Sequence, residues 1–262
     1  MNRRFPGMDR RTAVVTGAGE GIGRAIALRL AKDDLHVYVT DMILGKAQAT
    51  AELIKEAGGV ATACEMNVLN EEEIAAVVDL VVKENGHIDV WCNNAGVSSM
   101  GRLWDMTEHD WDFNMDINAK GVFMCTKGFV KVMMKQGYGK IINTASIASL
   151  RADPMLSCYC ASKWAVAGYT RTCARELGPY GITANYVCPG PVATSMNVRE
   201  NAWSAEIQNS TPEQVKQDLI DQIPLGRLTA PEDVANAVAF FASLESNYIN
   251  GAQLTVTGGM EA

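Results

Sequence analysis

The sequence predicts an α/β fold, a doubly wound parallel sheet with helices on both faces. Short β-branched runs alternate with segments of helical periodicity along the whole chain, which is the pattern of a parallel sheet with helical connections. A glycine-rich turn, residues 16–23, directly follows the first of these runs, as in sheets that bind nucleotides. The 262 residues, 48% hydrophobic and 20% charged, suit one large domain with a sizeable core. Together these observations predict a single Rossmann-type domain over residues 1–262.

Apolar runs predict the strands of this sheet. We expect strands at Thr12–Thr16, His36–Thr40, Val60–Met66, Ile88–Cys92, Lys140–Thr144, Thr183–Val187 and Gln253–Val256. Apolar residues spaced three to four apart predict helices between them, at Ile22–Lys32, Lys46–Glu56, Glu71–Glu84, Thr107–Lys135, Ser157–Leu177 and Pro231–Ser243. The polar segment Thr194–Gln222 shows no strong periodicity, which is typical of a functional lid or a disordered loop. We therefore expect a substrate lid at about residues 194–222.

Composition argues against several classes of function. The net charge of −7 and the pI near 5.1 disfavour nucleic acid, acidic membrane surfaces and an acidic carrier protein as partners. No apolar run reaches the roughly 18 residues of a membrane span, and the N-terminal MNRRFPGMDRR lacks the apolar stretch of a secretory signal. Seven cysteines without a C-x-x-C pair predict reduced thiols and a cytoplasmic protein. The three histidines lack metal-ligand spacing, so we expect no metal.

The glycine-rich turn predicts a dinucleotide site. The glycines of TGAGEGIG permit a tight turn and let backbone N–H groups approach a pyrophosphate at a helix N-terminus. Asp41 ends the second predicted strand, where a carboxylate can accept hydrogen bonds from both ribose hydroxyls of NAD and would repel a 2′-phosphate. Glu20 is acidic where a phosphate site would prefer Lys or Arg. The sequence therefore predicts NAD rather than NADP as the cofactor.

The stretch from Ser146 to Lys163 predicts a proton-transfer site. Tyr159 and Lys163 lie four residues apart on a predicted helix, so they share one face. A free phenol has a pKa of about 10, and a neighbouring ammonium lowers that pKa toward the working pH. Ser146 follows a predicted buried strand, where its hydroxyl could hold the oxygen of an alcohol or a carbonyl beside the phenol.

From Thr12 to Gly259 the chain resembles the classical branch of the short-chain dehydrogenase/reductase family. The motifs that carry the resemblance are the T-G-x-x-x-G-x-G turn, Asn93-Asn94-Ala95-Gly96, Asn118, Ser146, Tyr159-x-x-x-Lys163, and Pro189-Gly190 with Thr194. The resemblance implies hydride transfer between a secondary alcohol carbon and NAD, with Tyr159 as general acid/base. It also implies that Lys163 lowers the pKa of Tyr159 and binds the nicotinamide ribose. Ser146 would position the substrate oxygen, and Asn118 would hold a water that relays protons from Lys163.

The resemblance further implies which residues contact the ligands. The expected cofactor contacts are Gly17, Gly19, Glu20, Gly21, Ile22, Gly23, Asp41, Met42, Asn67, Val68, Asn94, Ala95, Gly96, Tyr159, Lys163, Pro189, Gly190, Val192, Thr194 and Met196. The expected substrate contacts are Ser98, Ser146, Ala148, Asp153, Tyr159 and Pro191, with Val97, Ile147 and Tyr186 as further candidates. Three positions depart from the family pattern. Asn67 replaces the Asp that usually contacts adenine, and Ser149 replaces a common Gly, so we expect it to reshape the substrate side. Thr257 stands before Gly258-Gly259, where Asp is usual.

Several substrate classes and one non-enzymatic function are open. Segments such as KIINTAS and GITANYVCPGPVATSM are similar to the acetoin/2,3-butanediol and polyol dehydrogenases, which implies an NAD-dependent oxidoreductase of a small diol or polyol. The first alternative is a hydroxysteroid dehydrogenase, because Met106, Met155, Met196 and Trp203 could line an apolar site. The others are a 3-oxoacyl carrier-protein reductase and a cofactor-binding scaffold without activity. The family's usual assembly implies a homotetramer.

Overall fold

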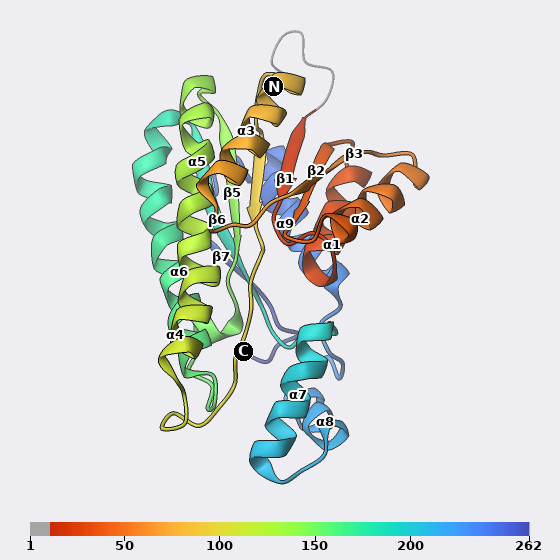
Figure 1. The fold of residues 1–262 in the computed structure, drawn as a ribbon, viewed down its shortest axis with the longest axis vertical. Coiled ribbons are helices and arrows are strands. Elements are labelled where there is room, and N and C mark those ends of the chain that lie inside the picture. The colour runs from red at the N-terminus through yellow and green to blue at the C-terminus, as the bar shows by residue number, and fades with distance from the viewer. Residues whose placement is uncertain (1–10, 262) are drawn as a thin grey trace.

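A computed structural model describes residues 11–261 and arranges them around a seven-stranded parallel sheet (Figure 1). In sheet order the strands are β3 (Val60–Glu65), β2 (His36–Asp41), β1 (Thr12–Val15), β4 (Val90–Asn93), β5 (Gly139–Thr144), β6 (Ile182–Pro189) and β7 (Gln253–Val256). The strand order reverses between β1 and β4, and ligands of such sheets bind at the carboxyl ends of the strands near this reversal. The N-terminal segment, for which the sequence predicts no secretory signal, lies outside the described residues.

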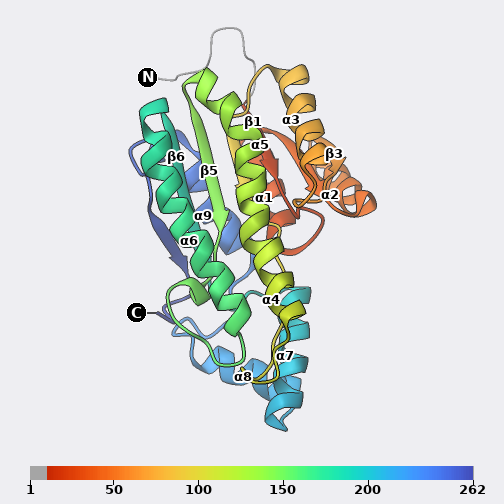
Figure 2. The ribbon, with the colours of Figure 1, turned by 60° about the vertical axis from the view of Figure 1, so that its left-hand side comes forward.

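Helices cover both faces of the sheet, which confirms the predicted fold class. One face carries α1 (Gly21–Lys32), α2 (Leu44–Glu56) and α9 (Pro231–Ala242), and the other carries α3 (Glu71–Asn85), α5 (Gly121–Gln136) and α6 (Ser157–Leu177) (Figures 1 and 2). Successive strand residues point to opposite faces. Val15 and Val39 therefore join the core under the first set of helices, while Val14 and Tyr38 join the core under the second.

The segment predicted as one long helix over Thr107–Lys135 is divided. A short helix, α4 (Glu108–Asn114), begins at Thr107, whose side chain accepts a hydrogen bond from the Asp110 N–H. A π-helical turn, Met115–Lys120, then joins α4 to α5. Such turns occur mostly inside α-helices at functional sites, and the apolar periodicity of the sequence contains no signal for this one.

The predicted irregular lid is instead helical. Residues 195–221 form α7 (Ser195–Gln208) and α8 (Pro212–Asp221), each capped by a threonine, Thr194 and Thr211, that accepts a hydrogen bond from a backbone N–H of the first turn. The prediction of irregular structure was wrong because α7 buries polar side chains, Asn197, Asn201 and Ser204, and therefore shows no apolar period. Within residues 11–261 every helix falls short of the length or apolarity that crossing a membrane needs.

Candidate active site

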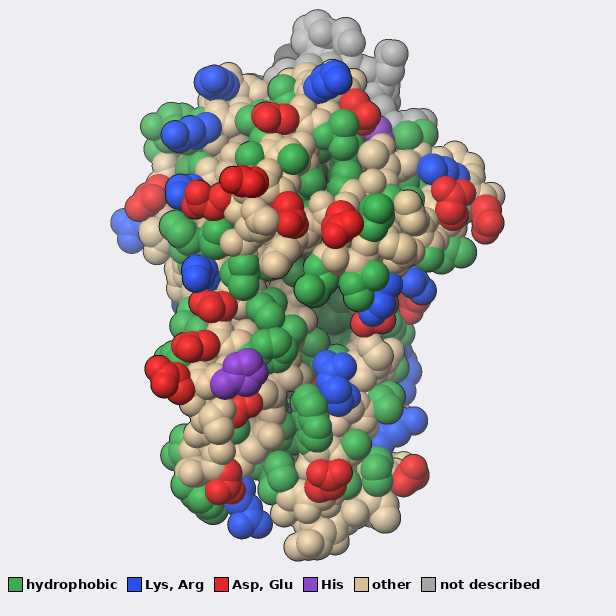
Figure 3. Space-filling model, in the orientation of Figure 1, with side chains coloured by type: hydrophobic (Ala, Val, Ile, Leu, Met, Phe, Trp, Pro, Cys, Tyr) green, Lys and Arg blue, Asp and Glu red, His purple; other side chains and the backbone are tan. Residues whose placement is uncertain are grey.

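A pocket of about 910 Å³ lies at the carboxyl ends of the strands, and residues of α7 and α8 line part of it. Figure 3 shows this face of the molecule hollowed between its upper body and the α7–α8 part, with hydrophobic side chains around the hollow. The expected cofactor contacts line the pocket, with the exception of Gly19. The Gly19 N–H donates to the Asp41 carboxylate (3.0 Å) and so holds this pocket-lining residue in place. Asn67 lies in the wall, and its side-chain oxygen accepts the Leu69 N–H (3.0 Å).

The glycine-rich turn fits the pyrophosphate of a dinucleotide. Gly17 has a φ of +60°, and an added Cβ would lie 2.8 Å from the Ala95 Cα, so only glycine fits there without strain. The Asn94 side chain donates to the Thr16 and Gly17 carbonyls (3.1 and 3.3 Å), which ties the turn to β4. No side chain caps the N-terminus of α1 at Glu20. Its first N–H groups are therefore available to an anion.

The far end of the pocket is acidic. The two oxygens of Asp41 accept hydrogen bonds from the backbone N–H groups of Gly19 and Ile43 (both 3.0 Å). This holds the carboxylate at the end of β2, with lone pairs left for further donors. Lys46 lines the pocket nearby, but its ammonium is paired with Glu20 (3.1 Å).

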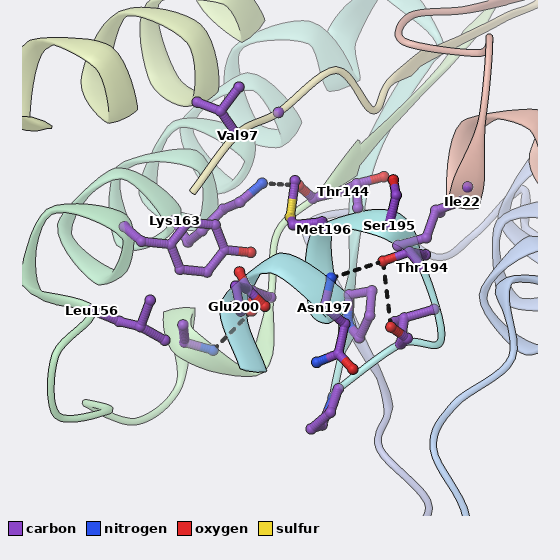
Figure 4. Close-up of a pocket in the computed structure, with 18 of the residues that line it drawn as sticks. Ile22, Val97, Thr144, Leu156, Lys163, Thr194, Ser195, Met196, Asn197 and Glu200 are labelled. Carbon is purple, nitrogen blue, oxygen red and sulfur yellow. Dashed lines mark hydrogen bonds between the residues drawn. The ribbon is translucent and has the colours of Figure 1, made fainter. Parts of the chain in front are cut away.

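Tyr159 and Lys163 lie on the pocket-facing side of α6, as their spacing predicts. The Lys163 Nζ donates to the Thr144 carbonyl (3.0 Å) and lies 5.6 Å from the centre of the Tyr159 ring (Figure 4). Burial lowers the pKa of Lys163 to about 8. Burial and the Glu200 carboxylate raise the pKa of Tyr159, and a hydrogen bond with Ser146 opposes this rise. The structure thus shows a raised Tyr159 pKa instead of the expected lowering, because burial disfavours the phenolate.

Ser146 caps a short 3-10 turn after β5. Its Oγ accepts the Ala148 N–H (3.1 Å), which aims the hydroxyl into the pocket. Ser149 does not reshape the substrate side, contrary to expectation. It is buried outside the pocket lining, donates to the Ser146 carbonyl (2.6 Å) and contacts the Cys188 sulfur (3.5 Å). Ser149 therefore supports the turn that presents Ser146.

Asn118 lies behind the pocket wall, in the π-helical turn Met115–Lys120. Its Oδ1 accepts the Val97 N–H (2.8 Å), and its Nδ2 donates to the Val97 carbonyl and the Ser162 hydroxyl (both 2.9 Å). An added Cβ on Gly96 would lie 3.0 Å from Asn118 Oδ1. The turn therefore fixes Asn118 against the loop after β4. Its role in a proton relay stays a prediction.

The expected substrate contacts are only partly gathered. Those that line the pocket are Ser146, Ala148, Asp153, Tyr159 and Pro191, with the further candidates Val97 and Ile147. Ser98 is not in the lining. It is 2% exposed and lies behind the wall, where its hydroxyl lowers the pKa of Glu200. Tyr186 is fully buried away from the pocket and donates to the Gln253 side chain (3.2 Å). Tyr186 belongs to β6, where the alternation of side chains along the strand turns it into the core. Ser98 lies in the loop after β4.

The sequence reasoning missed a row of polar residues on α7. The members that line the pocket are Asn197, Glu200, Asn201, Ser204 and Gln208. Their spacing of three to four places them on one face of a helix, and this spacing could have been found in the sequence. Among the described residues, no group of three or more His, Cys, Asp or Glu side chains could hold a metal ion.

Comparison with known proteins agrees with this geometry. A family model described as enoyl-(acyl carrier protein) reductase matches residues 17–261. A 3-oxoacyl-(acyl-carrier-protein) reductase, FabG of Staphylococcus epidermidis, is 39% identical over 251 residues, which are 95% of this chain and 98% of that protein. The chain belongs to the short-chain dehydrogenase/reductase family. A short-chain dehydrogenase/reductase of Armillaria gallica is 40% identical over 254 residues, 95% of each chain.

Solved structures extend the match to the fold. A variant actinorhodin polyketide ketoreductase, solved with NADPH, superposes with a TM-score of 0.93 at 34% identity and covers 96% of this chain and 97% of its own. Levodione reductase superposes with a TM-score of 0.90 at 30% identity and covers 95% and 96%. The protein is therefore an oxidoreductase of this family, with a pocket for a nicotinamide cofactor.

Proposed function

We propose that the protein is an NAD-dependent oxidoreductase that interconverts a small polar secondary alcohol, a diol or polyol, with its ketone. The observation that carries this proposal is the polar face of α7, which lines the substrate end of the pocket with the side chains of Asn197, Glu200, Asn201, Ser204 and Gln208. Buried polar groups need hydrogen-bond partners. A substrate with several hydroxyls along its length supplies such partners, whereas the hydrocarbon of an acyl chain or of a steroid nucleus does not.

The chain's own residues supply position and proton transfer. When bound, the nicotinamide takes up or supplies the hydride. Tyr159 takes the hydroxyl proton during oxidation and returns it during reduction, and Ser146 holds the substrate oxygen beside the phenol. The Lys163 ammonium stabilises the phenolate and binds the ribose, while Asn118 holds the water that relays the proton.

The preference for NAD is supported by the charges at the adenosine end. Asp41 faces this end, and the one cation that lines it among the described residues, Lys46, is neutralised by Glu20. A 2′-phosphate would meet the Asp41 carboxylate there without a free cation to offset the repulsion. The similar ketoreductase was solved with NADPH. We propose that this chain differs from it by preferring NAD.

A second candidate is a 3-oxoacyl carrier-protein reductase, favoured by the 39% identity with the staphylococcal enzyme over nearly its whole length. The hydroxysteroid alternative is less well supported. Met155 and Met196 line the pocket, but Met106 and Trp203, which would complete an apolar site, do not. A cofactor-binding scaffold without activity would not require Ser146, Tyr159 and Lys163 together in one pocket.

We also propose a cytoplasmic homotetramer in which residues 194–222 act as the substrate lid. The location is supported by the seven cysteines, all of which are free and buried. The assembly is supported by Phe123 of α5 and Trp164 of α6, which are 46% and 51% exposed, since apolar side chains that gather into one exposed patch mark interaction surfaces. Sedimentation equilibrium at a mass of one chain would contradict the tetramer.

The test of function is a spectrophotometric screen at 340 nm with NAD+ and NADP+. One panel contains diols and polyols, a second contains hydroxysteroids, and a third contains 3-hydroxyacyl thioesters. We expect turnover of a small diol or polyol with NAD+. Turnover confined to thioesters with NADP+ would favour the second candidate, and bound NAD without turnover of any panel would favour the scaffold.

A further inference from the structure

Glu200 is a charged group in the substrate end of the pocket that the proposed reaction does not use. It projects from the middle of α7 into the pocket, with Lys163 and Leu156 across from it (Figure 4). Within residues 11–261 it forms no salt bridge, and the one charged group that shifts its pKa is Arg199 on the same helix, which lowers it. The Arg199 guanidinium lies over the Trp203 ring (5.5 Å), so it is held away from the carboxylate.

The surroundings of Glu200 leave the carboxylate short of donors. Burial raises its pKa, and the Ser98 hydroxyl opposes this rise. That hydroxyl is buried and makes no hydrogen bond of good geometry among the described residues. An ionised carboxylate has about four lone-pair positions. Glu200 is only partly exposed, at the pocket surface, and a half-buried carboxylate with so few partners is stabilised by a ligand that donates hydrogen bonds to it.

Glu200 also opposes the chemistry when it is left unpaired. After burial, the Glu200 carboxylate is the second cause of the raised Tyr159 pKa, so it disfavours the phenolate that oxidation requires. Ser146 acts on the same phenol from the strand side and lowers its pKa. Tyr159, Ser146 and Glu200 line one pocket, so a substrate whose reacting oxygen lies at the phenol would place a neighbouring substituent toward Glu200.

The other charges at this end point to the same kind of ligand. Arg151 is the only other cation there among the described pocket residues apart from Lys163, and it is paired with Asp153 (3.0 Å) and Glu261 (3.2 Å). Asp218 adds a further carboxylate to the lining. This end is therefore net negative, which disfavours a carboxylate or phosphate on the substrate and favours a hydrogen-bond donor.

We propose that Glu200 is a specificity-determining residue that accepts a hydrogen bond from a donor group, a hydroxyl or an ammonium, on the substrate carbon next to the reacting one. This inference rests on the proposed function and narrows its substrate to vicinal diols or vicinal amino alcohols. Donation to Glu200 offsets its charge beside Tyr159, so the same contact that selects the substrate also removes the hindrance to the phenolate.

The test compares four alcohols that differ at one substituent: 2-butanol, 2,3-butanediol, 3-amino-2-butanol and 3-methoxy-2-butanol, each with NAD+. The methoxy compound can accept hydrogen bonds but cannot donate them. For the wild type we expect kcat/KM at least tenfold higher for the diol or the amino alcohol than for the methoxy compound. In Glu200→Met, which removes the acceptor at similar length, this ratio should fall about 10- to 100-fold, the effect of one hydrogen bond to a charged group.

Two further variants identify the donor and control for the helix. Glu200→Gln keeps an oxygen acceptor but not the charge, so it should retain most of a preference for a hydroxyl and lose a preference for an ammonium. Glu206→Gln removes a carboxylate from the exposed side of the same helix, outside the active-site pocket, and should leave every ratio at the wild-type value. An unchanged ratio in Glu200→Met, with 2-butanol still oxidised, would overturn the role of Glu200 while the proposed function stood.

Binding measurements separate failure of the inference from failure of the proposed function. If no alcohol is oxidised, calorimetric titration of the diol, the amino alcohol and the methoxy compound into the NAD complex still reports on Glu200. Binding that requires the donor and is lost in Glu200→Met would support the inference although the proposed activity had failed. Equal binding of all three compounds, or binding of none, would overturn it.

Discussion

Replacing Asp41 should relax the preference for NAD over NADP, and the size of the effect follows from the site. A hydrogen bond to a charged group contributes about 1.5–3 kcal/mol. Because the carboxylate is partly exposed, we take about 3 kcal/mol for the two ribose hydroxyls together. In water, charges of −1 and −2 about 5 Å apart repel by roughly 1.5–2 kcal/mol, and Asp41→Ala removes this term from NADP binding. The sum is about 4.5–5 kcal/mol, which is roughly a 2,000- to 5,000-fold change in the NAD-to-NADP preference.

Asp41 also braces the backbone, so the experiment needs variants that separate charge from structure. Its oxygens accept the Gly19 and Ile43 N–H groups, and Asp41→Ala leaves both without that partner. Asp41→Asn keeps one carbonyl oxygen and loses the charge, so it should show a smaller shift in the same direction. Glu65→Gln removes a charge from the exposed residue paired with Asp41 on β3. It should leave the preference unchanged.

The assay is fluorescence titration of each variant with NADH and with NADPH, which needs no knowledge of the substrate. Unfolding in urea, measured in parallel, reports damage to the turn. An Asp41→Ala protein that folds but keeps the wild-type ratio of NADH to NADPH affinity would refute the assignment of Asp41 to the ribose. An equal shift in Glu65→Gln would mean that overall charge, not a contact, sets the preference.

Three other perturbations test the reacting end. Tyr159→Phe should abolish turnover, measured at 340 nm, while NADH fluorescence titration shows unchanged binding; retained turnover would contradict the acid/base role. Gly96→Ala places a Cβ 3.0 Å from Asn118 Oδ1 and 3.4 Å from Lys163 Nζ, so kcat/KM should fall at least tenfold. The control is Gly45→Ala, because the space around Gly45 is open. This variant should stabilise α2 slightly and leave kcat/KM unchanged. The fall of the Lys163 pKa from 10.5 to about 8 corresponds to about 3 kcal/mol. Below pH 8 Lys163 is charged in both states, and the folded state is destabilised by the full amount. Between pH 8 and 10.5 Lys163 is protonated in the unfolded chain but neutral in the folded protein, so the free energy of unfolding rises with pH. In urea unfolding, Lys163→Met should therefore be more stable than the wild type at pH 7 and should lose most of this advantage by pH 10. A difference in unfolding free energy that does not change with pH would contradict a buried, charged Lys163.

The sheet could be predicted from the sequence because each strand carries its own local signal. Buried parallel strands are continuous apolar runs, and all seven predicted runs overlap strands of the structure. The glycine turn is equally local, since its backbone geometry requires glycine at positions such as Gly17, which has a positive φ. Tyr159 and Lys163 were predictable for the same reason, because four residues on one helix already place both side chains on one face.

The parts that could not be predicted depend on contacts between distant segments. The π-helical turn around Asn118 exists within a network that joins it to Val97 and Ser162, residues 21 and 44 positions away. Ser98 was expected in the pocket and lies behind it, near Glu200. In both cases the outcome depends on which side chain the neighbouring segment presents, and no local pattern contains that information.

The error on α7 has a different cause, and it bears on how such a segment should be interpreted. A search for apolar periodicity treats a polar helix as irregular, yet Asn197, Asn201 and Ser204 recur at helical spacing and are buried. A helix does not turn polar groups inward without partners for them, and within α7 there are few: Asn201 donates to Asn197 (3.3 Å) and Gln208 donates to Ser204. The remaining donors and acceptors face the pocket. A polar stripe of helical period along a segment that lines a pocket is therefore consistent with a ligand-binding face, and here it supports the proposed substrate, which can exchange hydrogen bonds along its length.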